Sequence, residues 1–492
     1  MSFKVAIGKA EKAEYPKIPP YNPSVRFPEY PFNEVSDEPN YVYEALRELF
    51  LLLGYDKDNY GTDVWNPLGE IIKPGMTVVI KPNFVLSRHF ENKDVYSIIT
   101  HPSLLRAIAD YCWIALRGTG KIIIADAPQY NCNFNELVKT TRLDEVIDFY
   151  TRKRGVEVKL FDLRNYWSKS LHMPSCLRKL PGDPLGSAMI NLGRESAFYD
   201  KQNKEKIYGA VYHRWETIQH HSGEIQEYEI SRTILSADVF ISVPKMKIHK
   251  KVGVTLNAKG LVGIATNKNL IVHYTLGTPE EGGDQFPDGL LTPTEKKIIK
   301  FERWCYDTFL AKRSVWFELI HRFIYGFLYL KIAKPLGLNV PEEKRLLDAG
   351  NWYGNDSAWR MCVDLMRIIH FADANGKLHD TLQRRMFSVV DGIIGGENVG
   401  PLVPDPKPVG VLIGGENLFA VDLVATRLMG FDPMKLKQFS YILSSANNYG
   451  IKSIDDIEIL SHFEDFRGCL KDRKSRFFDF RPHPGWIGHI EI

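Results

Sequence analysis

Hydrophobic residues along this chain occur in two patterns, short continuous runs and runs with helical spacing. The short runs predict buried strands at residues 76–80, 121–125, 156–161, 237–243, 386–390 and 409–413. Helical spacing predicts helices at residues 41–53, 102–116, 136–153, 361–371 and 419–429. Because strands alternate with helices, we expect an α/β fold with mainly parallel sheets, whose ligands bind at the carboxyl ends of the strands.

Local composition divides the chain into five expected parts. They are a Pro-rich arm and helix at 1–70, an α/β lobe at 71–290, a helical insert at 291–350, a second α/β lobe at 351–450 and a tail at 451–492. We expect the two lobes to enclose a cleft. Aromatic and basic residues alternate at 294–335 in the insert. This pattern predicts peripheral membrane contact; the alternative is a homodimer interface or a packed helical subdomain.

Charge and cysteine content exclude several classes of protein. The net charge of +3 is too small for a dedicated nucleic-acid binder. The six cysteines are scattered, so we expect no iron–sulfur cluster or zinc ribbon. Without a signal-peptide pattern or an apolar run of spanning length, the sequence predicts a cytoplasmic protein.

Cationic residues are concentrated between residues 245 and 273, directly after a predicted strand. The segment holds Lys245, Lys247, His249, Lys250, Lys251, Lys259, Lys268 and His273, with glycines at 253, 260 and 263. A glycine-rich loop can bring backbone N–H groups close to a ligand, and the lysines suit a phosphate, a carboxylate or a nucleotide diphosphate. The alternative is a solvated basic loop. Lys259 follows the mostly apolar residues 254–258, which favours a partly buried lysine with a lowered pKa.

The motifs around these residues resemble those of a family known as domain of unknown function 362. The resemblance rests on Val243-Pro244-Lys245-Met246-Lys247-Ile248-His249, on residues 253–263, on Lys81-Pro82-Asn83, on residues 391–395 with Gly400-Pro401, and on residues 420–425. Together these blocks cover about residues 75–275 and 385–430. Many members carry a ferredoxin-like iron–sulfur segment, whose cysteines this chain lacks.

The order of His249, Lys259 and His273 also resembles, more distantly, that of nickel-dependent lactate racemase. That resemblance implies Lys259 as the tether of a nickel pincer nucleotide, His249 as a catalytic acid/base and His273 as a metal ligand. From the residues alone we predict His249, Lys259 and His273 to be catalytic. We predict Lys245, Lys247, Thr255 and Asn257 to bind the anion.

Three further groups of polar residues follow predicted strands. Lys81 and Asn83 are predicted to clamp an anion, although Pro and Asn are also common in ordinary turns. Asp126 suits a ligand-binding or helix-capping role equally well. Asp391 and Glu397, in a glycine-rich acidic loop, are predicted either to bind sugar hydroxyls or a divalent cation, or to form a plain connection.

These observations predict an enzyme that acts on an anionic, hydroxyl-bearing small molecule, such as a hydroxy acid, a sugar acid, a sugar phosphate or a nucleotide. The expected reaction is proton abstraction or epimerisation, with or without a divalent metal, because histidine and a desolvated lysine titrate near neutrality. One alternative is a non-catalytic binding protein for an anionic metabolite or cofactor. A second is a redox protein.

Overall fold

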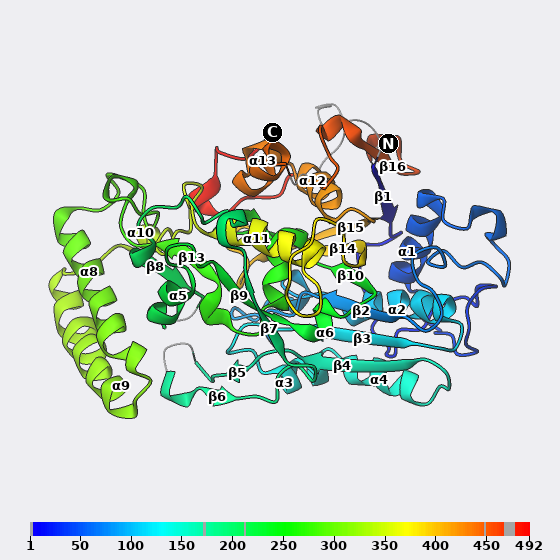
Figure 1. Ribbon diagram of the computed structural model, residues 1–492, viewed down its shortest axis with the longest axis horizontal. Coiled ribbons are helices and arrows are strands. Elements are labelled where there is room, and N and C mark those ends of the chain that lie inside the picture. The colour runs from blue at the N-terminus through cyan, green and yellow to red at the C-terminus, as the bar shows by residue number, and fades with distance from the viewer. Residues whose placement is uncertain (1–2, 171–173, 211–212, 447–448, 467–477) are drawn as a thin grey trace.

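A single large, mainly parallel β-sheet forms the centre of the molecule (Figure 1). The computed structural model describes residues 3–170, 174–210, 213–446, 449–466 and 478–492. The ten strands of the sheet are β1 (Phe3–Lys9), β2 (Thr77–Pro82), β3 (Lys121–Asp126), β4 (Glu157–Asp162), β10 (Val239–Val243), β11 (Lys245–His249), β12 (Gly253–Val254), β14 (Arg385–Glu397), β15 (Asp405–Gly415) and β16 (Ile457–Leu460).

The strand order is β16-β1-β15-β14-β10-β2-β3-β4, and β11 pairs with both β14 and β12. Strands β14, β10, β2, β3 and β4 are parallel to their neighbours in this series, whereas β15 is antiparallel to β14 and β1. The carboxyl ends of β10, β2 and β3 therefore meet at one edge of the sheet. The register pairs Lys81 with Ser242, and the last residue of β3 is Asp126.

Helices cover both faces of the sheet, so its strands read as continuous hydrophobic runs. Val78 and Ile80 of β2 belong to a core formed with α1 and α2, while Val79 between them belongs to a second core formed with α11, α12 and α13. The helices are α1 (Tyr41–Leu53), α2 (Pro102–Leu116), α3 (Phe134–Thr140), α4 (Leu143–Thr151), α5 (Arg214–His220), α6 (Arg232–Leu235), α7 (Leu256–Gly260), α8 (Pro293–Thr308), α9 (Val315–His321), α10 (Glu342–Arg345), α11 (Ala358–Phe371), α12 (Leu418–Leu428) and α13 (Lys437–Ser444).

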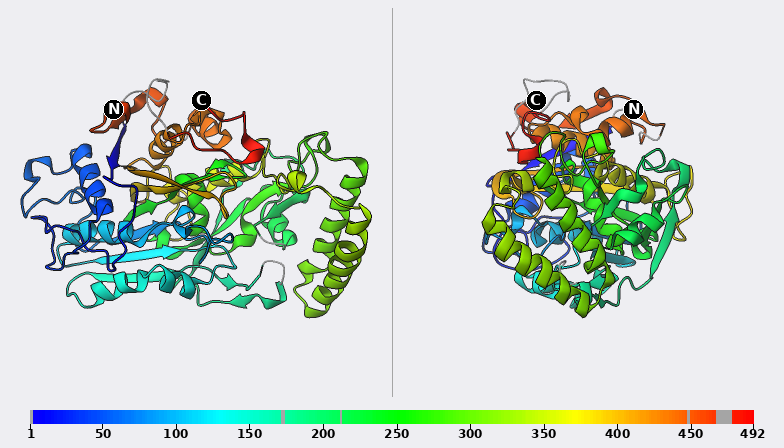
Figure 2. Two further views of the ribbon diagram at one scale, coloured as in Figure 1. Left: turned by 180° about the vertical axis from the view of Figure 1, so that it is seen from behind. Right: turned by 90° about the vertical axis from the view of Figure 1, so that its left-hand side faces the viewer.

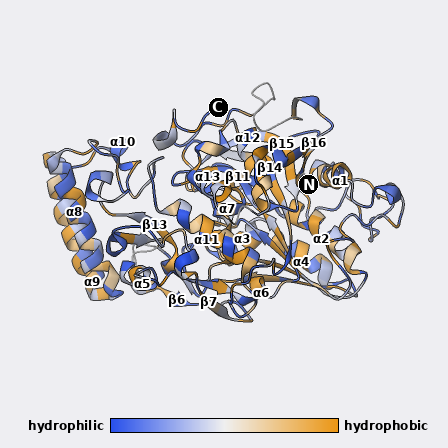
Figure 3. Ribbon diagram, turned by 45° about the horizontal axis from the view of Figure 1, so that its top comes forward, coloured by the Kyte–Doolittle hydropathy of each residue, from blue (hydrophilic) through white to orange (hydrophobic). Residues whose placement is uncertain are grey.

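The predicted α/β class, the mainly parallel sheet and the aromatic-rich helical insert are confirmed. The strands of the two expected lobes, however, share one sheet, because β14 pairs directly with β10 in parallel register. Apolar strands that are buried on both faces can join one sheet from distant parts of the chain, and a hydrophobic pattern does not identify their partners. Figure 3 shows hydrophobic residues concentrated in these central strands.

The segment at 245–273 is not the long glycine-rich loop that we expected. It contains β11, β12, α7 and β13 (Val272–Thr275), with short 3₁₀ turns at Leu261–Ile264 and Lys268–Leu270. The remaining strands form small two-stranded sheets: β5 (Tyr166–Trp167) with β6 (Arg178–Lys179), β7 (Ser187–Asn191) with β9 (Glu227–Ser231), and β8 (Ile207–Gly209) with β13. The basic side chains are thus presented by regular elements and tight turns.

The helical insert lies at one end of the molecule, at the left of Figure 1 and facing the viewer in the right-hand view of Figure 2. It contains α8, α9, a π-helical stretch, Arg322–Ala333, that directly continues α9, and the short helix α10. In the described part of the chain, no helix is long and apolar enough to cross a bilayer.

Candidate functional site

A basic cavity of about 510 Å³ lies beyond the carboxyl ends of β2 and β3. Its volume falls within the range of about 300–1,000 Å³ that is usual for small-molecule sites. The charged and histidine side chains that line it are Lys81, Asp126, Lys247, His249, Lys250, Lys251, Lys259, Lys268, His273, Arg303, Arg345 and Asp348. Six lysines and two arginines thus face two aspartates, so the lining favours an anionic ligand.

Two strand ends provide one wall of the basic cavity. Lys81 Nζ lies 2.8 Å from Asp126 Oδ1, and both side chains are 3% exposed. Asp126 Oδ2 accepts a hydrogen bond from the backbone N–H of Phe84, at 2.7 Å. Burial raises the pKa of Asp126, although Lys81 opposes this shift. Both residues line the cavity, but each already has a partner in the other.

Gly263 makes this ion pair possible. A Cβ at Gly263 would lie 1.9 Å from Asp126 Oδ1 and 2.5 Å from Lys81 Nζ. We therefore expect Gly263→Ala to displace the buried ion pair and to lower the free energy of unfolding by about 1–3 kcal/mol, the usual cost of overpacking. Urea unfolding followed by circular dichroism measures this loss.

The matched control is Gly260→Ala, three residues earlier. A Cβ at Gly260 would meet nothing closer than Pro244 Cβ, at 3.7 Å. Alanine is also favoured over glycine inside a helix, so this variant is expected to be as stable as the native protein or slightly more so. If both variants lost the same free energy of unfolding, the close approach of Gly263 to the Lys81–Asp126 pair would not be the cause.

A buried carboxylate fixes the short helix that carries Lys259. Asp422, in α12, accepts hydrogen bonds at 2.8 Å from the backbone N–H groups of Asn257 and Ala258 and from Asn257 Nδ2. Leu256, at the start of α7, has a φ of 43°, a left-handed conformation that is rare for leucine. Burial raises the pKa of Asp422 to about 7. Asp422 thus anchors the first turn of α7 and positions Lys259.

The two predicted catalytic histidines also line the basic cavity. His249 ends β11, and its Nδ1 accepts a hydrogen bond from the backbone N–H of Lys251 at 3.1 Å. His273 lies in β13, and its backbone carbonyl accepts a hydrogen bond from Asn355 Nδ2 at 3.1 Å. Burial and the nearby Lys259 lower the pKa of both imidazoles well below the usual value. Both rings are therefore neutral at pH 7.

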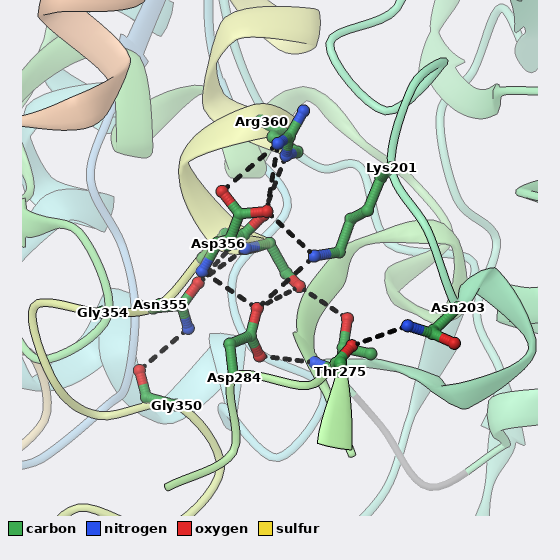
Figure 4. Close-up of polar contacts among 12 residues, drawn as sticks. Lys201, Asn203, Thr275, Asp284, Gly350, Gly354, Asn355, Asp356 and Arg360 are labelled. Atoms are coloured by element: carbon green, nitrogen blue, oxygen red, sulfur yellow. Dashed lines mark hydrogen bonds and ion pairs between the residues drawn. The ribbon is translucent and has the colours of Figure 1, made fainter. Parts of the chain in front are cut away.

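A polar network, drawn in Figure 4, anchors the strand that carries His273. Asp284 accepts hydrogen bonds at 2.6 Å from the backbone N–H of Thr275 and from the Ser357 hydroxyl. Lys201 lies 3.2 Å from Asp356 and 3.8 Å from Asp284. Since these charges and hydrogen bonds are buried or half-buried, they hold β13 rigidly beside the residues that precede α11.

Most of the lysines in the basic cavity have no acidic partner. Lys247, Lys250, Lys251, Lys259 and Lys268 have no carboxylate oxygen within 4 Å among the described residues, whereas lysines are seldom buried without one. Burial lowers the pKa of all five, and for Lys268 it lowers the pKa to about 7. A bound anion would supply the missing negative charge.

Three of these lysines donate hydrogen bonds to protein oxygen atoms. Lys247 Nζ lies 2.6 Å from the carbonyl oxygen of Ile98, and Lys268 Nζ lies 2.6 and 2.9 Å from the carbonyl oxygens of Val262 and Ala265. Lys251 Nζ donates to Asn351 Oδ1 at 3.0 Å. The amines of Lys259 and Lys250 make no hydrogen bond in the described part of the molecule, and Lys259 is the more deeply buried of the two, at 7% exposed.

Two uncharged oxygen atoms in the lining are also without partners. Among the described residues, Asn83 Oδ1 and Thr255 Oγ1 are buried and form no hydrogen bond. Both residues belong to the lining of the basic cavity and are less than 7% exposed. Buried polar atoms normally have a hydrogen-bond partner, so these two atoms are candidate hydrogen-bond acceptors for a ligand.

Lys245 and Asp391, both predicted to bind the anion, form a separate buried network. Lys245 Nζ lies 3.1 Å from Asp391 Oδ1 and 2.6 Å from the hydroxyl of Tyr15 on the N-terminal arm. Tyr15 donates to Asp391 at 2.6 Å. The pairing of β11 with β14 shifts register between Lys245 and Lys247, which separates the environments of the two lysines. Neither Lys245 nor Asp391 lines the basic cavity.

Asn257 and Glu397 are likewise engaged elsewhere and do not line the basic cavity. Asn257 is fully buried, where it contacts Asp422 and accepts a hydrogen bond from Ser388 at 3.0 Å. Glu397 binds Arg481 and Lys407, both at 2.9 Å. Asp391 and Glu397 both belong to β14 and not to a loop, so the predicted acidic wall opposite the lysines is not formed.

The insert contributes lining residues that the sequence did not indicate. Arg303 and Tyr306 in α8, Arg345 in α10 and Asp348 all line the basic cavity. Arg303 pairs with Asp348 at 2.6 Å, and Arg345 pairs with Glu302 at 2.6 Å. Arginines that alternate with aromatic residues in a helix suggested a surface role, and no local pattern connected them to residues 245–273.

A metal site built from protein ligands alone does not fit these residues. Within the described ranges, no group of three or more His, Cys, Asp and Glu side chains could hold a metal ion. His273 is thus not part of a group that could hold a metal ion without a cofactor, and its metal-binding role stays a prediction. The cavity does bring His273 together with His249 and Lys259.

Comparison with known proteins identifies the family. A family model described as domain of unknown function (DUF362) matches residues 178–427. The chain belongs to this family. The DUF362 match includes β10 to β14, α7 and the helical insert, but it begins after Lys81, Asn83 and Asp126, which the expected blocks included. No curated protein matches the chain. The comparisons do not support the likeness to lactate racemase, so the roles that it implies remain predictions.

Proposed function

We propose that the basic cavity binds an anionic, hydroxyl-bearing small molecule and that Lys259 abstracts a proton from it. The observation that carries the proposal is Lys259, a buried residue of the cavity lining whose amine makes no hydrogen bond to a described residue. Structural lysines at such depth are paired with an acid or a carbonyl group. A free amine is available to a substrate.

The environment of Lys259 suits a general base. A base must be unprotonated at the working pH, and an ordinary lysine, with a pKa near 10.4, is not. Burial lowers the pKa of Lys259. Lys247 and Lys251 lie close enough to Lys259 for their charges to interact with it. A lowered pKa increases the fraction of neutral amine that can accept a proton, within a cavity that attracts anions.

His249 is suited to donate a hydrogen bond to the reacting group. Because its Nδ1 accepts the backbone N–H of Lys251, the neutral ring carries its proton on Nε2. Removal of a proton next to a carbonyl or carboxylate develops negative charge on oxygen, which such a donor stabilises. Asn83 and Thr255 would accept hydrogen bonds from substrate hydroxyls, while Lys247, Lys250 and Lys251 would bind the anionic group.

Proton exchange with solvent tests the proposal directly. We would incubate the protein in D₂O with 2-hydroxy acids, sugar acids and sugar phosphates and follow the carbon-bound protons by ¹H NMR. The proposal expects loss of the signal from a proton next to the carboxylate or carbonyl in at least one compound. Binding of these compounds without exchange would instead favour the non-catalytic binding protein.

The binding-protein alternative rests on the same excess of lysines. Five lysines without acidic partners among the described residues, four of them buried, would bind an anion whether or not a reaction follows.

The redox alternative has less support. The described cysteines are free thiols, and none of them lines the basic cavity. Cys469 lies outside the described residues.

A further inference from the structure

The helical insert exposes an unusual number of large hydrophobic side chains. Of the 32 exposed large hydrophobic residues in the described part of the chain, 12 lie within residues 315–338. Trp316 is 77% exposed, Leu336 75% and Phe323 59%. Soluble proteins seldom expose so many apolar side chains together, and such patches mark interaction sites. We call these twelve exposed side chains the apolar face; they are Val315, Trp316, Phe317, Leu319, Ile320, Phe323, Phe327, Leu328, Leu330, Ile332, Leu336 and Leu338.

Packing of the insert onto the body does not account for this exposure. The opposite side of the same helix contacts α8, where the rings of His321 and Tyr325 lie 5.6 and 6.1 Å from that of Tyr306. The buried Tyr329 accepts a hydrogen bond from Arg345 at 3.1 Å. Contacts on this side are enough to hold the helix on the body, so the apolar face is not needed to pack the insert.

Within residues 312–338 the charged residues are almost all cationic, although Lys334 Nζ lies 3.9 Å from Glu342 Oε1 just beyond this range. Lys312, Arg322, Lys331 and Lys334 are exposed. The one acidic residue between 312 and 338 is Glu318, which is buried and accepts a hydrogen bond from Ser175 at 2.6 Å. Aromatic and aliphatic side chains flanked by Lys and Arg match the interface of a bilayer, where rings lie at headgroup depth and cations meet anionic lipids.

We propose that the apolar face is a docking surface for anionic membranes. Exposed lysines favour this partner over a second copy of the chain, because lysine is depleted in the cores of protein interfaces. Since no described helix could cross a bilayer, the insert would lie in the plane of the membrane surface. α8 also supplies Arg303 and Tyr306 to the basic cavity, so docking would hold the cavity near the lipid headgroups. The proposal does not depend on the proposed function.

Flotation of the purified full-length chain tests this surface. The probes are vesicles of phosphatidylcholine alone and of phosphatidylcholine with phosphatidylglycerol. We expect the protein to float with the anionic vesicles and W316E/F323E to remain in the soluble fraction. K331Q/K334Q is expected to bind anionic vesicles about thirtyfold more weakly, since each cation near the surface contributes about 1 kcal/mol and 1.4 kcal/mol corresponds to tenfold.

The control variant is L382E/I487E, which places two charges at side chains that are each 61% exposed but lie outside the insert. It is expected to float like the native chain. Circular dichroism checks that all variants are folded, and light scattering measures their mass. Recovery of the native chain wholly in the soluble fraction with both kinds of vesicle would overturn the proposal. So would W316E/F323E converting a dimer to a monomer while vesicle binding is unchanged.

Discussion

Replacing Lys259 with methionine is expected to abolish proton exchange between the substrate and D₂O. General-base catalysis contributes about 10²–10⁴-fold to a rate, and Lys259 is a buried lysine of the basic cavity whose amine makes no hydrogen bond to described residues. Methionine has a similar length and no titratable group, so the shape of the cavity is retained. The measurement is the ¹H NMR exchange rate of a compound that the native protein labels.

Two additional measurements distinguish a lost base from a damaged site. Lys259→Met removes a buried polar side chain that makes no hydrogen bond to a described residue, so its free energy of unfolding is expected to equal or exceed that of the native protein. In Lys259→Ala, added ethylamine is expected to restore part of the exchange by occupying the vacated space. Lys159→Met, at an exposed lysine of β4, is the control for loss of a positive charge. Native exchange rates in Lys259→Met would disprove the assigned role.

Much of the fold could be predicted because its strands are buried on both faces. The apolar runs at residues 76–80 and 121–125 correspond to β2 and β3, and their polar ends mark the edge where the basic cavity lies. The single sheet could not be predicted in the same way. Strand β14 pairs with β10 about 145 residues earlier, and a hydrophobic run gives no information about which strand lies beside it.

The candidate site was predictable where a side chain follows a strand or lies in an apolar context. On that basis the sequence indicated eight residues that line the basic cavity, namely Lys81, Asn83, Asp126, Lys247, His249, Thr255, Lys259 and His273. Prediction from the sequence failed where a site residue contacts a residue that is distant in the chain. Tyr15, which closes the Lys245–Asp391 pair, lies 376 positions from Asp391. Motif spacing cannot separate a lysine that meets such a partner from one that faces a cavity.

The affinity of the basic cavity for a simple anion is expected to fall as the pH rises above about 7. Burial lowers the pKa of Lys268 to about 7, so in the free protein this lysine loses its charge between pH 6 and 8. A bound anion stabilises the charged form and raises the pKa toward the usual value. Binding above pH 7 therefore takes up a proton, and affinity falls by up to about tenfold per pH unit for each proton taken up. Below pH 6 Lys268 is charged in both the free and the anion-bound protein, so it adds no pH dependence to the affinity.

Sulfate is the appropriate probe because it remains a dianion over this whole range, so any pH dependence comes from the protein. Isothermal titration calorimetry between pH 6 and 9, in buffers of different ionisation enthalpy and with chloride at equal ionic strength, gives both the affinity and the number of protons taken up. Lys268→Met is expected to bind more weakly at pH 6 and to take up about one proton fewer at pH 8, because the neutral side chain can neither pair with the anion nor titrate. The control Lys159→Met should retain the native slope. Two results would contradict this prediction: a sulfate affinity that does not change with pH, or a pH dependence in Lys268→Met equal to that of the native protein. Either would mean that Lys268 keeps its charge when no anion is bound.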